Sequence, residues 1–225
     1  MSKFPFLSVK SIPVLFWSSS RPLNFQPQPV TLIFLVFGLL LFGLGEAILI
    51  AAGIGVSPWT VLALGISNVT TLSIGASTFL ISVMVLFFWI PLKQIPGIGT
   101  ILNVIIIAIV LEYIIPYLPN PKTNFYIIIQ ALIGVLITGI GSAIYLISNL
   151  GPGPRDGLMT GLQQLTNQTI FMIRSCIEIT VVMIGWLLGG PVGLGTILFA
   201  FLIGPAVASS IYILDKILKI ESKIR

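Results

Sequence analysis

The sequence of 225 residues has few charged side chains, no histidine and a single cysteine. Charged residues make up 8% of the chain, whereas about a quarter of a typical soluble domain is charged. Six acidic and eleven basic side chains cannot keep the surface of a soluble globule of this size wetted. The scarcity of charge therefore excludes one or two ordinary soluble domains.

The missing histidines and cysteines exclude several kinds of site. With Cys176 as the only cysteine, the chain can form neither an intramolecular disulfide nor a Cys/His zinc site, and no mechanism can use histidine as a base. We therefore expect no metal, no cofactor, no catalytic residue and no enzyme activity. A nucleic-acid partner is not expected either, because the cations that give the net charge of +5 are scattered rather than gathered in a basic stripe.

Hydrophobic residues, at 56% of the chain, gather in long runs that predict membrane spans. A spanning helix needs roughly 20 mostly apolar residues, and proline- and glycine-containing turns separate six such runs. The sequence therefore predicts an all-α polytopic membrane protein with six transmembrane helices. The predicted spans are 30–52, 73–90, 99–118, 125–148, 170–188 and 195–214.

The distribution of cations predicts the orientation of these spans. With the N-terminus in the cytoplasm, six spans place ten of the eleven cations inside and only Lys122 outside, as expected because Lys and Arg resist translocation. Five spans would separate the termini and spoil this bias, so both termini are expected to be cytoplasmic. The cations predicted inside are Lys3, Lys10, Arg21, Lys93, Arg155, Arg174, Lys216, Lys219, Lys223 and Arg225.

Two halves of the chain resemble each other at an offset of 96 residues. The matches that carry information are glycines and prolines, because these residues mark backbone geometry. They are Gly43/Gly139, Gly45/Gly141, Gly55/Gly151, Pro58/Pro154, Gly65/Gly161, Gly97/Gly193 and Gly99/Gly195. Each unit holds three spans, an odd number, so the two units are expected to insert as inverted repeats. Many secondary transporters share this architecture. Channels also use it, and a duplicated scaffold that moves no solute is a further alternative.

The repeat predicts five segments in the chain. An interfacial or flexible tail precedes the first span, the fourth span begins in the linker between the two membrane repeats, and a basic tail ends the chain. The predicted segments are the tail 1–29, the first repeat 30–118, the linker 119–133, the second repeat 134–214 and the tail 215–225. Small residues recur on the first and fourth spans, which predicts close packing between those two helices.

A helix too short and too polar to span is predicted after the first and after the fourth span. Glycines end the preceding helix, Ser or Gly stands at the N-cap, and proline occupies the first turn of each new helix, over 58–68 and 154–166. Each helix is either re-entrant or interfacial. A re-entrant helix would aim its positive N-terminal end at an anion inside the protein. The substrate-binding residues predicted on this basis are Ser57, Pro58, Trp59, Thr60, Gly153, Pro154, Arg155 and Asp156.

Charges within the spans are the next candidates, since they are costly there and seldom face lipid. Arg174 and Glu178 are spaced i,i+4 and are expected to pair along one helix face. Asp156 is expected to cap its helix, and an Arg155–Asp156 clamp is an alternative to a substrate site. Glu46 and Glu112 are candidates for proton or cation coupling, with a packing role as the alternative that we favour for Glu46.

The motifs at these positions resemble the YczE-like integral membrane proteins, a group related to the YitT-type set. Segments 55–62, 72–75 and 89–100 resemble the first half of that family, and segments 151–161, 173–178 and 185–200 resemble its second half. The resemblance implies a bacterial cytoplasmic membrane protein of the permease type and supplies no substrate. Thr60 stands where the family commonly has Asp, and Ala63 and Leu64 stand where polar residues are frequent, which implies an altered outer gate if that Asp takes part in function.

Taken together, these features predict a small-molecule permease that works by alternating access. A small organic anion or zwitterion would bind at the starts of the short helices, and a carboxylate such as Glu178 or Glu112 would couple protons. A passive channel of the same symmetry and a non-transporting scaffold or regulatory protein are the alternatives. Membrane lipid is the other expected partner, and a homodimer is left open for a chain this small.

Overall fold

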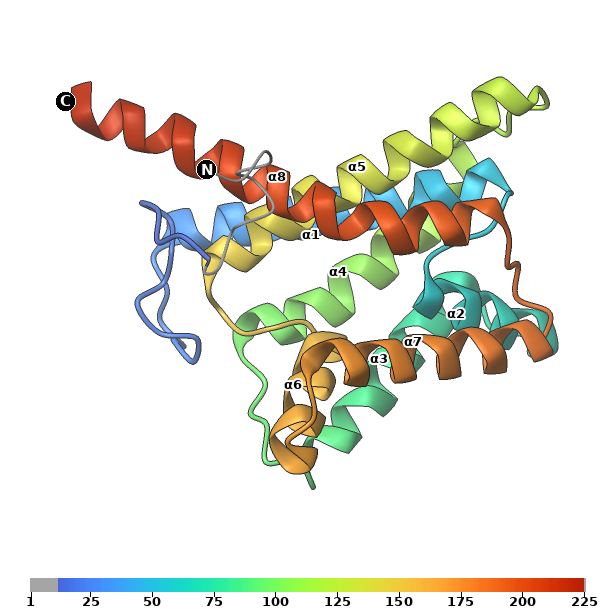
Figure 1. Ribbon diagram of the computed structural model, residues 1–225, viewed down its shortest axis with the longest axis horizontal. Helices are drawn as coiled ribbons and strands as arrows, with labels where there is room; N and C mark the ends of the chain where they lie inside the picture. The colour runs from blue at the N-terminus through green and yellow to red at the C-terminus, as the bar shows by residue number, and fades with distance from the viewer. Residues whose placement is uncertain (1–11, 225) are drawn as a thin grey trace.

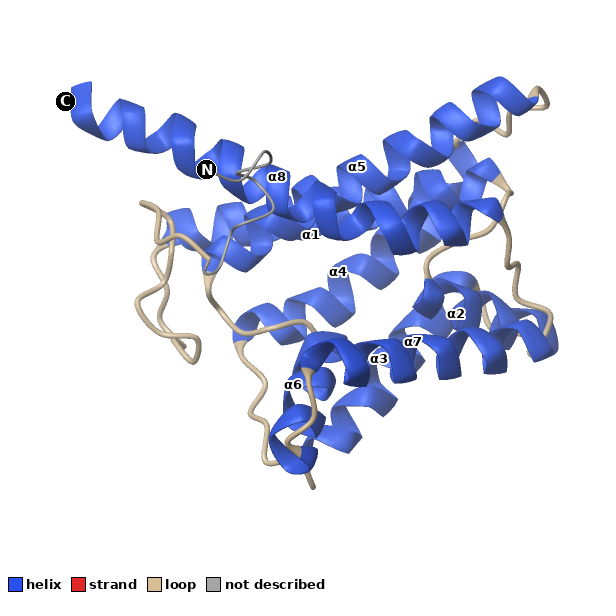
Figure 2. Ribbon diagram, in the orientation of Figure 1, coloured by secondary structure: helices blue, strands red, loops and turns tan. Residues whose placement is uncertain are grey.

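The structure, a computed structural model, describes residues 12–224, with side chains up to 218. In this part of the chain all regular structure is helical (Figures 1 and 2). The cations Lys3, Lys10 and Arg225, part of the predicted orientation, lie outside the described residues. The helices are α1 (Pro29–Ala52), α2 (Pro58–Val69), α3 (Ile74–Trp89), α4 (Ile98–Ile114), the 3₁₀ turn η2 (Ile115–Tyr117), α5 (Asn124–Ser148), α6 (Pro154–Thr166), α7 (Ile170–Leu187) and α8 (Leu194–Ile224).

The apolar helices agree with the predicted spans in place and differ in one detail. Five are long and apolar enough to cross a membrane: α1, α4 with η2, α5, α7 and α8. The predicted span 73–90 is the 16-residue helix α3, which passes that test only together with α2, to which it is joined at a bend of 118°. The described part of the chain thus has five candidate spans, or six if this bent pair counts as one.

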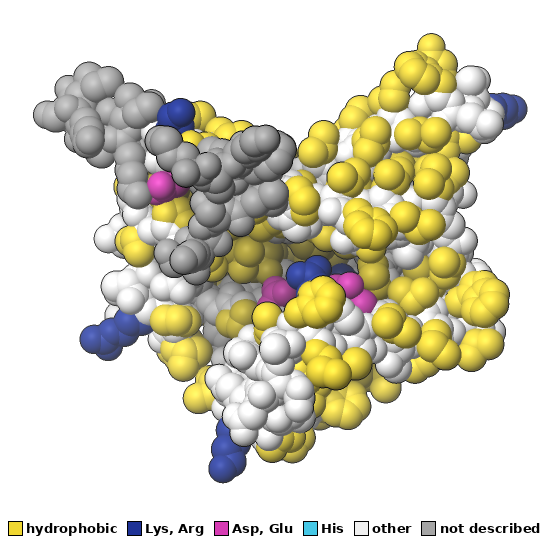
Figure 3. Space-filling model, viewed as in Figure 1, with side chains coloured by type: hydrophobic (Ala, Val, Ile, Leu, Met, Phe, Trp, Pro, Cys, Tyr) yellow, Lys and Arg dark blue, Asp and Glu magenta, His cyan; other side chains and the backbone are white. Residues whose placement is uncertain are grey.

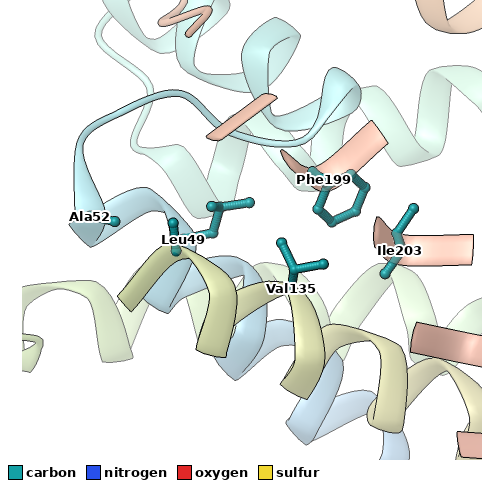
Figure 4. Close-up of a cluster of buried hydrophobic side chains, with 6 residues drawn as sticks. Leu49, Ala52, Val135, Phe199 and Ile203 are labelled. Carbon is teal, nitrogen blue, oxygen red and sulfur yellow. The ribbon is translucent and has the colours of Figure 1, made fainter. Parts of the chain in front are cut away.

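The helices form two layers joined by α4 (Figure 1). One layer contains α1, α5 and α8, with α5 packed against both others, and the second contains α2, α3, α6 and α7. Helix α4 packs against α1 on one side and α3 on the other. The first layer is closed at one end by an apolar cluster where the end of α1 meets the first halves of α5 and α8 (Figure 4). This cluster contains Leu49, Ala52, Ala131, Val135, Phe199 and Ile203.

Glycines bring α1 and α5 into close contact, as the sequence predicts. A Cβ placed on Gly38 would lie 2.9 Å from the carbonyl oxygen of Gly141, and one on Gly134 would lie 2.8 Å from the carbonyl oxygen of Gly45. Side chains larger than hydrogen would therefore force the two backbones apart. Because Gly38 and Gly134 are 96 positions apart, as are Gly45 and Gly141, each half supplies the same two positions to this interface.

Two backbone hydrogen bonds repeat the same reciprocity. The Gly99 N–H at the start of α4 donates to the carbonyl of Leu150 at 2.7 Å, and the Gly195 N–H at the start of α8 donates to the carbonyl of Ile54 at 2.7 Å. Ile54 and Leu150 are 96 positions apart, and so are Gly99 and Gly195. The loop that follows the first long helix of each half is thus bound to the start of the last helix of the other half.

The short helices also pack on the opposite half of the chain. Helix α2 lies against α7, where Gly65 fits against the backbone of Gly185, and α6 lies against α3, where Gly157 fits against the ring of Trp89. The Trp89 indole N–H donates to the carbonyl of Pro154 at 2.9 Å. These contacts hold each short helix against a long helix of the other half.

Residues just before the first helix pack against it, although they fall in the predicted N-terminal tail. Trp17 is buried and stacks on Phe34 of α1 at 4.3 Å between ring centroids, and the Ser19 N–H donates to the carbonyl of Ser148 at 3.0 Å. A free or flexible tail therefore does not describe residues 15–19. At the other end, α8 continues through Ile224, so the helix of the last predicted span runs on beyond 214 into the segment predicted as a basic tail.

Candidate functional site

A cavity of about 410 Å³ lies between the two layers. Figure 3 shows a mostly hydrophobic face with a central hollow in which basic and acidic side chains gather. One wall, on α8, is apolar, with Phe199, Ile203, Val207 and Ile211. The polar side chains lining the rest include Ser57, Asn103, Ser142, Tyr145, Arg155, Asp156, Arg174 and Glu178. The cavity thus offers charge on one side and hydrocarbon on the other.

Both short helices begin at this cavity, with the local geometry that the sequence predicts. Helix α2 has Ser57 at the N-cap and α6 has Gly153 there, each followed by proline at the first helical position. The loops leading to them match in conformation, since Gly55 has φ 106° and Gly151 has φ 108°, values that favour glycine. The sequence therefore predicted both helix starts correctly, with α2 one residue longer than expected.

Arg155 and Trp59 both line the cavity and lie against each other. The guanidinium carbon of Arg155 lies 5.3 Å from the centroid of the Trp59 ring, a cation–π distance. Trp59 is buried against Ile81, Val85 and Trp89, so its ring is a fixed surface for the cation. Arg155 is thus held beside the cavity with its N–H groups free of any ion pair to Asp156, and the clamp between these neighbours that the sequence suggested is not formed.

Asp156 is bound from another helix. Its Oδ2 accepts a hydrogen bond from the Tyr145 hydroxyl of α5 at 2.8 Å. The sequence predicted that this carboxylate would cap its own helix, but the side-chain bond that forms runs to α5 instead. A residue inside an apolar span, 11 positions earlier in the chain, becomes its partner because the loop 149–153 places the first turn of α6 beside the end of α5.

The predicted pair of Arg174 and Glu178 is present on α7. The Arg174 Nε lies 2.8 Å from Glu178 Oε1, and the two side chains are 50% and 25% exposed. Both residues line the cavity with Arg155 and Asp156. The structure therefore collects four of the charges singled out in the sequence at one place.

Glu46 belongs to α1, and its side chain reaches the start of α2, where it is only 1% exposed. Its Oε2 accepts hydrogen bonds from the hydroxyls of Ser57 at 2.8 Å and Thr60 at 2.7 Å, and these two hydroxyl oxygens lie 2.9 Å apart. Helix α1 continues for six residues beyond Glu46, so the carboxylate is ~9 Å from the helix end at a rise of about 1.5 Å per residue. Glu46, treated apart from Ser57 and Thr60 on the basis of the sequence, thus forms one buried cluster with them.

Glu112 is the candidate that the structure sets apart. Its Oε2 accepts a hydrogen bond from the Gly75 N–H at 3.2 Å, in the first turn of α3. It lines a different pocket, between α3 and α4, together with Phe79 and Tyr113. Its carboxylate therefore caps a helix end and does not reach the central cavity.

Sequence reasoning missed Tyr145 and Asn103, which line the cavity from α5 and α4. Polar side chains inside apolar runs were the available signal, but Ser, Thr and Asn occur at many such places and most bond to their own helix. The residues on α8 carried no signal at all, since any apolar span supplies Phe199 or Ile203.

The chain matches a family model described as a family of unknown function (DUF6198) over residues 30–211. This match contains both short helices and every residue of the cavity named above. It therefore covers the whole of the candidate site.

Three relatives are similar over most of the chain. An uncharacterized protein of Haemophilus influenzae is 42% identical over 199 residues, which cover 88% of this chain and 90% of that protein. The uncharacterized membrane protein YczE of Bacillus subtilis is 31% identical over 174 residues, with coverages of 77% and 78%. The uncharacterized protein YyaS of Bacillus subtilis is 29% identical over 168 residues, with coverages of 72% and 82%. The YczE-like resemblance is confirmed. No solved structure matches the chain.

Proposed function

The chain belongs to the DUF6198 family, is a YczE-like membrane protein, and from that premise we propose that it is a small-molecule permease of the bacterial cytoplasmic membrane. In this proposal it is a secondary transporter that moves a small organic anion or zwitterion by alternating access. The observation that carries the proposal is the central cavity, at which two short helices begin and which Arg155 lines with no ion-pair partner among the described residues.

The two halves are proposed to be inverted three-span repeats, with α2 and α3 together as the second of six spans. The reciprocal contacts support this, because Gly99 binds Leu150 as Gly195 binds Ile54. Contacts that exchange between equivalent positions are those of a two-fold relation. An odd number of spans in each half would place that axis in the plane of the membrane.

The site fits an anionic group attached to an apolar body. Helix starts carry partial positive charge, and Arg155 adds a full one. The α8 wall offers only hydrocarbon to the remainder of a ligand, at Phe199, Ile203 and Val207. Asp156 and Glu178 could receive an ammonium group, which keeps zwitterions within the proposed class. The cavity volume of about 410 Å³ suits a molecule of a few to about fifteen non-hydrogen atoms.

The conformation described here is proposed to be the inward-facing one. In the proposed orientation, with both termini cytoplasmic, Asn103 and Arg174 lie in the cytoplasmic halves of α4 and α7 and line the cavity. The opposite ends of α1, α5 and α8 are sealed by the apolar cluster of Leu49, Val135 and Phe199. A transporter at rest with one open and one sealed side matches this distribution.

Uptake into proteoliposomes tests the proposal. The panel consists of labelled benzoate, hexanoate, benzenesulfonate and phenylalanine, with benzylammonium as the cation that should be rejected. We expect saturable uptake of at least one anion or zwitterion, reduced at least tenfold by Arg155→Ala. The matched control is Lys122→Ala, which removes an exposed cation that does not line the cavity.

The outcomes separate the alternatives. Uptake that rises linearly with concentration would indicate a passive channel. No protein-dependent uptake of any panel member, from a folded preparation, would contradict the permease and favour a scaffold or regulatory protein.

A further inference from the structure

Glu112 is a charged residue on the outside of a candidate membrane span. It lies in the span Ile98–Tyr117 and is exposed rather than buried in the bundle. Its Oε2 accepts one hydrogen bond, from the Gly75 N–H, and among the described residues no cation pairs with it. A charge on the surface of a spanning helix is costly and seldom faces lipid without a partner. The carboxylate therefore has room for a cationic partner from outside the chain.

An apolar groove of about 610 Å³ extends from this carboxylate between α3 and α4. The buried residues that line it are small, and a Cβ on Gly75 would lie 2.6 Å from the carbonyl oxygen of Ala108. The larger apolar side chains that line it are each exposed by 40% or more: Phe79, Leu80, Ile105 and Ile109. The groove is thus open to the surroundings of the helices, which for a membrane protein are lipid chains.

The carboxylate end of the groove has the features of a membrane surface. Glu112 bonds to the first turn of α3, and the exposed threonines at 70–71 stand shortly before that helix. Tyr113 and Tyr117 are 68% and 86% exposed, as in the aromatic belt at a lipid–water interface. From Tyr113 to Ile105 the groove extends ~12 Å along α4, which is most of one leaflet of a hydrocarbon core about 30 Å thick. A headgroup at one end and an acyl chain along the rest would therefore match its dimensions.

We propose that this groove binds a phospholipid with a primary ammonium in its headgroup, with the ammonium on Glu112 and one acyl chain between α3 and α4. The ammonium donates N–H bonds to the carboxylate and supplies the positive charge that the described residues do not. A glycerol headgroup brings no positive charge, and a trimethylammonium headgroup has no N–H to donate, so both should bind more weakly. In the proposed orientation the lipid belongs to the outer leaflet. The site is separate from the central cavity and does not depend on the proposed permease function.

Native mass spectrometry of the full chain in detergent tests the headgroup. The protein is equilibrated with equal amounts of phosphatidylethanolamine, phosphatidylglycerol and phosphatidylcholine that have identical acyl chains. We expect the phosphatidylethanolamine adduct to exceed each of the others about fivefold, the effect of an exposed ion pair. Glu112→Gln should abolish this preference. Glu178→Gln, the same change in the central cavity, should keep it.

Filling the groove tests the acyl chain separately. Ala76 is exposed and lines the groove, so Ala76→Leu should reduce the adducts of all three lipids. The matched control is Ala200→Leu, at an exposed residue of α8 that lines neither the groove nor the central cavity. Added phosphatidylethanolamine should also raise the unfolding midpoint of the wild type and of Ala200→Leu, because a ligand stabilises the state that binds it, and should leave that of Glu112→Gln unchanged.

Each outcome supports or contradicts the lipid site. Equal adducts of the three lipids, or a preference that survives Glu112→Gln, would overturn the inference. A preference lost only in Glu178→Gln would move the lipid to the central cavity, and dimers that dissociate in Ala76→Leu would show a second copy of the chain in the groove. If Glu112→Gln does not fold, the comparison of Ala76→Leu with Ala200→Leu decides. Solute uptake enters none of these measurements, so a failed permease would leave the lipid site standing.

Discussion

Trp59 and Arg155 occupy equivalent places in the two halves of the chain, 96 positions apart, and they touch each other, with the guanidinium carbon 5.3 Å from the ring centroid. Each is the second residue of its short helix, directly after the proline. The two helix starts therefore meet at this contact. Substitutions at these two residues therefore test whether their contact stabilises the arrangement of the two helix starts.

Replacing Trp59 with Leu should loosen Arg155 and also leave space in the buried cluster with Ile81, Val85 and Trp89. A cation–π contact contributes about 1–2 kcal/mol when it is shielded from water. We expect the free energy of unfolding to fall by more than this in Trp59→Leu, and the double variant Trp59→Leu/Arg155→Met to lose about 1–2 kcal/mol less than the sum of the single changes. Thermal unfolding in detergent measures both. The control is Trp186→Leu on the exposed face of α7, and a strictly additive pair would contradict the contact.

Tyr145→Phe should weaken the attachment of α6 to α5. The change leaves the Asp156 carboxylate without its hydroxyl donor, at a cost of about 1–3 kcal/mol for a part-buried charged acceptor. We expect lower thermal stability and weaker binding of any transported anion, since Asp156 would compete for Arg155. Tyr113→Phe, on an exposed ring, is the matched control. Equal stability of the two variants would show that the bond contributes nothing.

Gly45→Ala should destabilise the contact between α1 and α5. The new Cβ would lie 2.6 Å from the carbonyl oxygen of Gly134 and would also meet the backbone and hydroxyl of Thr138. Overpacking of this kind costs about 1–3 kcal/mol. Gly204→Ala, where no atom lies within 4 Å, should leave the unfolding midpoint unchanged. The prediction fails if both alanine variants unfold at the same temperature.

Arg174→Gln should affect transport more than stability. The Arg174–Glu178 pair is half exposed on the arginine side, and such i,i+4 pairs contribute less than about 0.5 kcal/mol. We therefore expect nearly unchanged unfolding and a severalfold rise in KM for an anionic substrate, because the cavity loses a cation. A large loss of stability with unchanged KM would assign the pair a purely structural role.

Labelling of introduced cysteines should reveal the proposed orientation. In a Cys176→Ser background, Lys122→Cys should react with an impermeant thiol reagent in intact cells, and Lys216→Cys should react only after the membrane is opened. Both lysines are exposed, so access depends on the side of the membrane. The reverse pattern would invert the orientation proposed here.

The parts of the fold that the sequence predicted are those encoded by local chemistry. Pro58 and Pro154 mark both helix starts, glycines mark the α1–α5 contact, and the spacing of Arg174 and Glu178 predicts their ion pair. Each of these signals depends on residues within one or two helical turns, or on a motif that occurs in both halves of the sequence.

The parts that it did not predict depend on how distant helices meet. Glu46 was treated as a packing carboxylate near the end of a span, because nothing local indicates that the chain returns to place Ser57 and Thr60 beside it. The bond from Tyr145 to Asp156 has the same cause. Glu112 was a coupling candidate beside Glu46, and only the tertiary arrangement shows that Glu112 bonds to the start of α3 whereas Glu46 bonds to side chains at the start of α2.

The backbone bonds from Gly99 to Leu150 and from Gly195 to Ile54 also constrain how this protein is made. The amide at the start of α4 has no such acceptor until the ribosome has produced another fifty or so residues, and the carbonyl of Ile54 has no such donor until about 140 further residues have been made. Neither half can complete these bonds alone, so a nascent chain holds unpaired backbone groups until both halves are present. Insertion factors that shield such groups, and the proteases that remove stalled chains, would both meet this protein in that unfinished state.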